Sequence, residues 1–167
     1  MTSKVHHIPE GFTSATPYLI IKDADRAIEF YKKVFAATEI MRMPGPDGKI
    51  MHAEIKIGNS ILMMADEFPQ AAGMGTRSPQ SLGNSSVILA LYVEDVDALA
   101  SKAVAAGARL VFPVTDQFYG DRSGRLIDPF GHVWMIATHK EDMTPEEMMK
   151  RFEGWMKKES QCAGPAS

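Results

Sequence analysis

His52 and Glu54 form the pair of side chains in this chain that is best suited to proton transfer. They alternate with apolar residues in the segment HAEIKI at 52–57, so in a strand both would point to one face. A neutral imidazole beside a carboxylate can gain basicity and accept a proton near neutral pH. The pair could also belong to a displaced metal site, although two candidate ligands without a third are weak evidence. The alternative is that this polar face meets only solvent.

A second group of polar residues runs through positions 116–125 and is the densest polar cluster in the chain. Loops carry binding and catalytic residues more often than strands do. Arg122 or Arg125 could hold a carboxylate or a phosphate through a bidentate fork, with Tyr119 in the same segment. The structural alternative is a loop held by its own hydrogen bonds, with Asp121 and Arg122 as partners.

Composition excludes several classes of function. The net charge is −3 without a basic stripe, so nucleic acid is not an expected partner. No apolar run approaches the roughly 18 residues of a membrane span, and the N-terminus lacks the apolar core of a signal peptide. The single cysteine, Cys162, excludes an intramolecular disulfide. No glycine-rich phosphate loop, serine nucleophile motif or His-Glu-x-x-His element occurs. We therefore expect a cytoplasmic protein that binds neither nucleic acid nor membrane.

The elements that must position these side chains occur twice. The segment LIIKDADRA at 19–27 returns as LYVEDVDAL at 91–99, and each copy continues into a helix-like stretch, a hairpin-like stretch and an apolar strand. The repeat divides the chain into a lead-in (1–14), a first module (15–66), a connector (67–86), a second module (87–139) and a C-terminal helix and tail (140–167). A chain built from two copies of one unit usually has its ligand site where they meet.

Each copy is predicted to follow the order β-α-β-β-β. Asp23 or Asp25 supplies an N-cap for the first helix, because a short side-chain oxygen can accept from the free amides of the first turn. The fold class expected is α+β, with helices on one side of curved mixed sheets. The predicted strands are 16–22, 50–57, 60–65, 87–93, 109–114, 125–127 and 132–138, with a second helix at about 95–106 and a polar loop over 117–124.

The C-terminal segment begins with the capping box TPEE at 144–147, which has proline at the first helical position. An apolar stripe follows at helical spacing, formed by Met148, Met149, Phe152, Trp155 and Met156. We expect this helix to dock on its own domain. The alternatives are a subunit interface and a lid over a ligand.

Two β-α-β-β-β copies, an Asp-containing turn into each helix, and the segment DPFGH at 128–132 form a specific combination. On these features the chain resembles the vicinal oxygen chelate superfamily, which includes glyoxalase I, bleomycin-resistance proteins and extradiol dioxygenases, and more narrowly its PhnB-like branch. The resemblance covers residues 13–140. It implies that each module curls its sheet into a cup, that two modules pair around a site, and that the protein is a homodimer.

The resemblance also locates the metal ligands of the metalloenzyme members, one on the first and one on the last strand of each module. Those positions fall at Thr16, Met63, Ile88 and Met135. None is His, Glu or Asp, and a methionine thioether is a poor ligand for the usual divalent ions. We therefore expect no metal and no other cofactor at these positions.

The same register predicts a mainly apolar cup with two phenols. The ligand-binding residues expected are Tyr18, Met63, Tyr92, Tyr119, Arg122, Arg125 and Met135. The leading hypothesis is a protein of the bleomycin-resistance type that binds a small, largely apolar molecule without metal. One alternative is a lyase, isomerase or dioxygenase-like enzyme that uses His52 and Glu54. Another is a structural or regulatory dimer whose cups are packed shut.

Overall fold

The computed structural model describes residues 7–68 and 77–162, with side chains to residue 158, and its first module is a four-stranded sheet with one helix. The first strand is parallel to the last, the other pairs are antiparallel, and the order in the sheet is β1-β4-β3-β2. Its elements are β1 (Tyr18–Ile21), α1 (Ala24–Phe35), β2 (Thr38–Pro44), β3 (Ile50–Ile57) and β4 (Ser60–Asp66).

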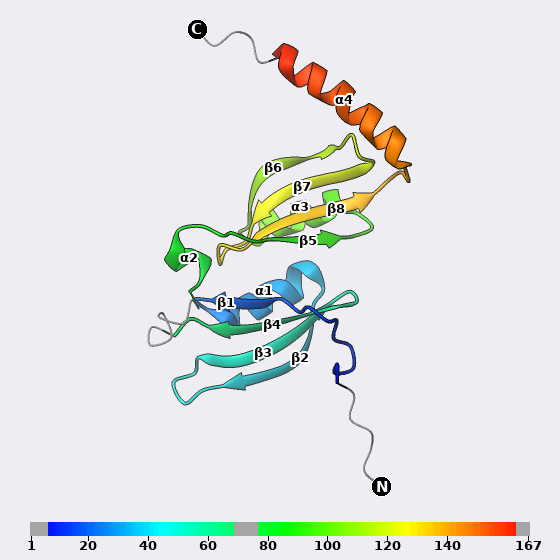
Figure 1. The fold of residues 1–167 in the computed structure, drawn as a ribbon. Helices are drawn as coiled ribbons and strands as arrows, with labels where there is room; N and C mark the ends of the chain where they lie inside the picture. The colour runs from blue at the N-terminus through cyan, green and yellow to red at the C-terminus, as the bar shows by residue number, and fades with distance from the viewer. Residues whose placement is uncertain (1–6, 69–76, 163–167) are drawn as a thin grey trace.

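The second module repeats this topology with the sheet order β5-β8-β7-β6. Figure 1 shows the two modules one above the other, joined by the segment that carries the short helix α2 (Pro79–Leu82). Its elements are β5 (Ile88–Tyr92), α3 (Val96–Ala105), β6 (Arg109–Asp116), β7 (Asp121–Ile127) and β8 (Val133–His139). The predicted fold class, an α+β chain of two β-α-β-β-β modules followed by a helix, is confirmed.

Both module helices begin at an aspartate that belongs to the repeated segment. The Asp23 side chain accepts from the backbone N–H of Arg26, and the Asp95 side chain accepts from that of Ala98. This settles the N-cap of the first helix as Asp23, since Asp25 lies in its first turn. The repeat therefore encodes the same strand-to-helix turn in each module.

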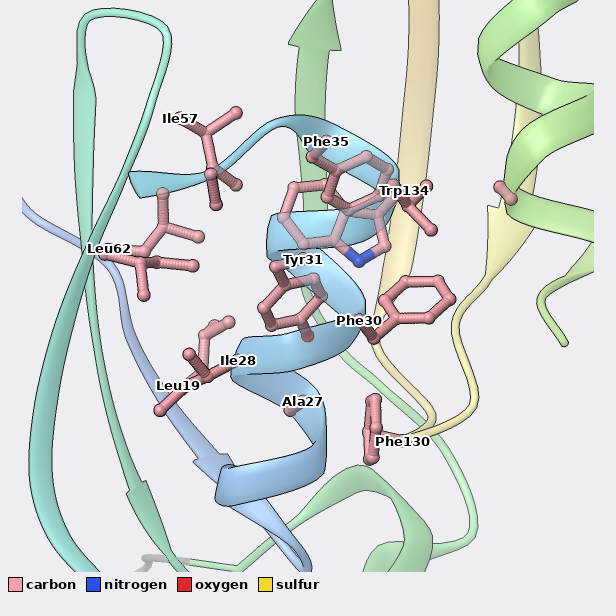
Figure 2. Close-up of a cluster of buried hydrophobic side chains, with 14 of the residues drawn as sticks. Leu19, Ala27, Ile28, Phe30, Tyr31, Phe35, Ile57, Leu62, Phe130 and Trp134 are labelled. Atoms are coloured by element: carbon pink, nitrogen blue, oxygen red, sulfur yellow. The ribbon is translucent and has the colours of Figure 1, made fainter. Parts of the chain in front are cut away.

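A single hydrophobic core joins the modules through their helix-bearing sides. The helix α1 contacts α3, and its aromatic side chains reach across to the second sheet, where Phe35 packs on Trp134 with 4.6 Å between ring centroids. Figure 2 shows Trp134 beside Phe35 and Tyr31, with Phe30 next to Phe130. Because both sheets turn their helix-bearing sides inward, the opposite side of each sheet, which we call its open face, points away from this core.

Two parts of the chain differ from the prediction. Strand β7 begins at Asp121, four residues before the expected start at Arg125, and β6 continues to Asp116, so the loop between them is only residues 117–120. The connector contains α2, capped by the Ser78 side chain, which accepts from the backbone N–H of Ser81. Residues 69–76 of the connector and 1–6 of the lead-in lie outside the described residues.

The C-terminal helix α4 (Pro145–Cys162) leaves the second module at the end of β8 (Figure 1). Its predicted capping box is formed, because Glu147 accepts from the backbone N–H of Thr144 and the Thr144 hydroxyl accepts from that of Glu147. Within the part of the chain that the structure describes, no helix has the length and apolar character needed to cross a membrane.

Candidate functional site

The open faces of the two sheets carry large side chains that are exposed to solvent. Tyr18 of β1 is 46% exposed and Phe112 of β6 is 58% exposed, although phenylalanine is usually buried. Strand alternation places most of the polar residues that the sequence analysis selected on these same faces, with Arg122 as the exception. The open faces are therefore the surfaces on which a candidate site must be sought.

Tyr18, His52 and Glu54 form a hydrogen-bonded chain on the open face of the first sheet, which we call the first-sheet cluster. The Tyr18 hydroxyl lies 3.0 Å from Nδ1 of His52, and Nε2 of His52 lies 3.2 Å from Oε1 of Glu54. Met63 of β4 lies between them, paired with Tyr18 on one side and with Glu54 on the other. The structure therefore brings together Tyr18 and Met63, which the sequence analysis expected in the cup, and the pair His52 and Glu54, for which it left the cup and solvent as alternatives.

The surroundings of the first-sheet cluster are apolar. Met41 pairs with Glu54 and Met43 pairs with His52, so both thioethers lie on the open face beside the cluster. Partial burial raises the pKa of the Tyr18 phenol, which keeps it protonated at neutral pH. The imidazole thus has a phenol on one nitrogen and a carboxylate on the other, an arrangement that can move a proton along a short path.

A cleft of about 500 Å³ lies on the open face of the second sheet, and we call it the second-sheet cleft. Its volume falls within the range of about 300–1,000 Å³ that is typical of small-molecule sites. Strands β6, β7 and β8 and the helix α4 supply its walls. The lining includes Phe112, Gln117, Tyr119, Arg125, Met135 and Trp155.

Arg125 is the charged residue in the wall of this cleft. Its guanidinium carbon lies 5.0 Å from the centroid of the Phe112 ring, which is the geometry of a cation–π contact. Its Nε is buried without a hydrogen-bond partner among the described residues. Among the described residues, the Phe112 ring contacts the guanidinium and no carboxylate pairs with it.

The loop at residues 117–120 closes one end of the cleft. The Tyr119 hydroxyl lies 3.2 Å from Oγ of Ser123, and Gln117 donates from its amide to the Thr115 hydroxyl. Gly120 has φ +89°, and a Cβ there would lie 2.4 Å from the carbonyl oxygen of Glu141, so only glycine fits. Phe118 stacks on Trp155 of α4, which positions that helix beside the cleft.

Tyr92, Asp121 and His139 form a second hydrogen-bonded group on the open face of the second sheet. The Tyr92 hydroxyl donates to Asp121 at 2.7 Å, and Nδ1 of His139 lies 2.7 Å from the same carboxylate. The hydrogen bond to Asp121 is the main cause that raises the pKa of Tyr92, and a second carboxylate, Asp142, helps Asp121 raise that of His139. His139 and Asp121 were not selected from the sequence, because their pairing depends on a strand that begins at Asp121.

The structure separates Arg122 from the other predicted binding residues. It points to the helix-bearing side of β7, where its guanidinium donates to both oxygens of Asp97 at 2.7 and 2.8 Å and to Asp116 at 3.2 Å. Asp121 and Arg122 do not pair with each other, since neighbouring residues of a strand face opposite sides. The structural alternative of internal hydrogen bonds is met in part, because Arg122 bonds to Asp116 and Tyr119 to Ser123 within the segment.

The two open faces are related by the repeat, with opposite charges at matching positions. In the first sheet Glu54 pairs with Met63 of the last strand, and in the second sheet Arg125 pairs with Met135 of the last strand. Each methionine also pairs with the first strand of its module, through Tyr18 and Ala90 respectively. Glu54 and Arg125 are therefore equivalent positions of the repeated unit.

The four positions that the resemblance assigns to metal ligands carry side chains that are poorly suited to divalent ions. Met63, Ile88 and Met135 lie on β4, β5 and β8, and Thr16 precedes β1. Among residues 7–68 and 77–162, no group of three or more His, Cys, Asp or Glu side chains is arranged to hold a metal ion. The donor types present do not fit the divalent ions expected of that site.

The strongest residues that sequence reasoning missed are Phe112 and Trp155. Phe112 is paired with Arg125 across β6 and β7 beyond an irregularity in the register, and alternation alone does not reveal which side of an irregular strand it faces. Trp155 was assigned to the apolar stripe of α4, but no sequence signal indicated that the helix would lie over the cleft. A lid was one of the alternatives considered for that helix.

Comparisons with known proteins agree with this architecture. A family model described as Glyoxalase/Bleomycin resistance protein/Dioxygenase superfamily matches residues 4–136. The uncharacterized protein Mb0911c of Mycobacterium bovis is 42% identical over 133 residues, which cover 80% of this chain and 88% of that protein.

Solved structures of other proteins share this fold. The crystal structure of TioX from Micromonospora sp. ML1 is 28% identical with a TM-score of 0.58, covering 79% of this chain and 100% of TioX. A PhnB protein from Bacillus cereus, titled a putative 3-demethylubiquinone-9 3-methyltransferase, has a TM-score of 0.58 at 18% identity, covering 75% of this chain and 99% of its own. The likeness to the PhnB protein extends to the fold alone.

Proposed function

The chain belongs to the Glyoxalase/Bleomycin resistance protein/Dioxygenase superfamily, and from this membership we propose that it binds a small, largely apolar molecule on its open sheet faces. Binding takes place without the metal site that is usual in the metalloenzyme members. The observation that carries the proposal is the second-sheet cleft, about 500 Å³ in volume. Its apolar walls with a few convergent polar groups are typical of sites that bury a carbon skeleton and orient it through specific contacts.

A second copy of the chain would complete the site. Both open faces leave large apolar side chains in solvent, including Tyr18, Ile88 and Phe112, and exposed apolar patches of this kind mark interaction surfaces. We infer a homodimer in which the open faces are covered by the partner. In that arrangement the ligand lies between the second-sheet cleft and the surface of the other copy.

Ligand-induced stabilisation tests this proposal. A molecule that binds the folded state raises its unfolding temperature by mass action. A panel of small apolar compounds is therefore expected to raise the unfolding midpoint of the wild-type protein. The variant Phe112→Ala is expected to lose most of the shift, because it removes one wall of the cleft from an already exposed position.

The matched control is Val104→Ala, which shortens a similarly exposed side chain on α3, away from the cleft. This variant is expected to keep the full ligand-induced shift. The proposal fails if no compound stabilises the wild-type protein, or if Phe112→Ala and Val104→Ala respond to the compounds in the same way.

The first-sheet cluster supports a second candidate, an enzyme that performs acid–base chemistry. The continuous chain from Tyr18 through His52 to Glu54 is the specific observation in its favour. In this role Glu54 orients the imidazole through Nε2, and Nδ1 of His52 accepts the phenol proton of Tyr18. The Tyr18 oxygen then takes a proton from the ligand, and reversal of both transfers returns a proton to it. A bound compound with an acidic C–H group would then exchange that hydrogen with solvent.

Proton NMR in D₂O separates the two candidates. For the enzyme, the C–H signal of a bound compound disappears with time in the presence of wild-type protein and persists with His52→Gln. For a binding protein, the signal persists with both proteins while the compound still raises the unfolding temperature.

A further inference from the structure

We propose that Arg125 anchors a carboxylate of the ligand, so that the second-sheet cleft takes a small apolar acid in preference to a neutral or cationic compound. This inference rests on the proposed binding function and specifies the class of molecule bound. The Arg125 guanidinium packs on the Phe112 ring and has no polar partner among the described residues.

Other arginines of the chain show what a partnered guanidinium looks like here. Arg42 bonds to Asp25, Glu29 and Glu39, and Arg122 bonds to Asp97 and Asp116. Arg125 makes no ion pair with any residue in the part of the chain that is described, although it is half-buried. A cation that is partly removed from water without a counter-charge is costly, and an anion delivered by a ligand would offset that cost.

The charge of the cleft is set by this one residue. Among the described residues that line it, Arg125 is charged and the others are neutral. None of these described lining residues is a carboxylate that would compete for the guanidinium. The bordering hydroxyls of Tyr119 and Ser123 share one hydrogen bond, so that one hydroxyl proton stays available to a further acceptor. The polar end of the cleft therefore offers donors to an incoming anion.

The rest of the lining selects the body of the ligand. Phe112, Met135 and Trp155 present apolar surface around the guanidinium, and an aromatic or aliphatic ring attached to the anion would pack against them. The cation–π contact places the Arg125 guanidinium over the Phe112 ring. The planar fork of a guanidinium favours a planar acceptor such as a carboxylate.

Because Arg125 is a single cation, the cleft favours a carboxylate over a phosphate monoester. A carboxylate carries one negative charge, which Arg125 balances. A phosphate carries close to two negative charges at neutral pH, and the described residues of the lining include no second cation. The cleft is therefore matched to a monoanion with an apolar body.

The experiment compares acids with neutral molecules of the same shape. Benzoate, phenylacetate and cyclohexanecarboxylate are each titrated calorimetrically against the full-length protein, and so is the primary amide of each acid. We expect the acid of at least one pair to bind at least about tenfold more tightly than its amide, which corresponds to a difference of about 1.4 kcal/mol in binding free energy. Inorganic phosphate, tested alongside, is expected to compete weakly.

Three variants test whether Arg125 is responsible for the preference for acids over amides. Arg125→Gln removes the charge and is expected to make acid and amide bind equally. Arg125→Lys keeps the charge but loses the planar fork, so a reduced preference for the acid remains. Arg109→Gln is the matched control, because it removes one positive charge from an exposed position of the same sheet outside the cleft. It is expected to behave as the wild type.

Each outcome decides a different point. Equal binding of acids and amides by the wild type would overturn the role of Arg125 while leaving the binding function intact. A preference for acids that survives Arg125→Gln would also overturn it, since another cation would then be responsible. If neither acids nor amides bind at millimolar concentration, the inference and the proposed function both fail.

Discussion

The Tyr31 hydroxyl of α1 donates a 2.7 Å hydrogen bond to Oδ2 of Asp128, which follows β7 in the other module. Asp128 is 3% exposed and accepts three further hydrogen bonds, from the indole N–H of Trp134 and from the backbone N–H groups of Phe130 and His132. The carboxylate therefore joins the first helix to the turn before the last strand, within the core shared by both modules.

Removing the Tyr31 hydroxyl is expected to destabilise the fold moderately. In Tyr31→Phe the carboxylate keeps three donors, so the free energy of unfolding should fall by about 1–2 kcal/mol. Asp128→Ala leaves four buried donors without their acceptor and should cost at least about 3 kcal/mol. Urea denaturation followed by circular dichroism measures both values.

Tyr92→Phe is the matched control for this pair. It also removes a tyrosine hydroxyl that donates to an aspartate at 2.7 Å, but the ring of Tyr92 is largely exposed. Its cost should stay below about 1 kcal/mol. Equal losses for Tyr31→Phe and Tyr92→Phe would show that burial of the inter-module bond contributes nothing.

The stability of the fold is expected to fall in mild acid because of His132. Burial lowers the pKa of this histidine, against the opposing effect of Asp128, so the folded state holds it neutral. An unfolded chain binds the proton near the ordinary value of about 6.5. The contribution of neutral His132 to the free energy of unfolding is therefore fully present above that pH, and it is lost as the pH falls through the lower folded pKa. Replacement by Phe, which does not titrate, should flatten the profile of unfolding free energy below about pH 6.5.

His139 gives the opposite slope and serves as the internal comparison. Asp121, with help from Asp142, raises its pKa, so its contribution is present below about pH 6.5 and is lost as the pH rises through the folded value. His139→Gln should therefore lower the free energy of unfolding below about pH 6.5 and remove the decline that His139 causes as the pH rises above that value. A profile that changes in the same direction for both histidine variants would contradict the assignment.

Periodicity predicted the parts of the fold in which one face is uniformly apolar. The pairing of Glu54 with Met63 follows from the alternation of two strands around the Gly58-Asn59 turn, and the structure has this register. The aspartate caps followed from the repeated segment. These features depend on residues that are close together in the sequence or belong to one hairpin, so the sequence alone is enough to predict them.

The parts that could not be predicted depend on tertiary partners. Strand β7 begins at Asp121, with polar residues that belong to the sheet because of their partners. Tyr92 and His139 bond to the Asp121 carboxylate on one face, and Asp97 bonds to Arg122 on the other. Without those partners the segment has the composition of a loop. The contact of Trp155 with Phe118 is likewise invisible in the periodicity of α4.

Purified protein is expected to hold no stoichiometric divalent metal. The positions that would supply ligands carry Thr16, Met63, Ile88 and Met135, whose side chains are poor donors for such ions. Elemental analysis of protein prepared without chelator should give far less than one ion per chain, and EDTA should leave the unfolding temperature unchanged. Near-equimolar metal that is lost in His52→Ala would instead favour the enzyme candidate with a displaced site at the first-sheet cluster.

Self-association is expected to depend on the open face of the first sheet. Met41 and Met43 flank the first-sheet cluster with their side chains in solvent, and burying them against a second copy would remove that apolar surface from water. The double variant Met41→Lys, Met43→Lys would bury two unpaired charges in the dimer, so its dissociation constant should rise by at least about tenfold. Val104→Lys, on the exposed side of α3, is the control and should leave the constant unchanged. Sedimentation equilibrium gives these constants, and a dimer that tolerates both lysines would place the interface elsewhere on the molecule.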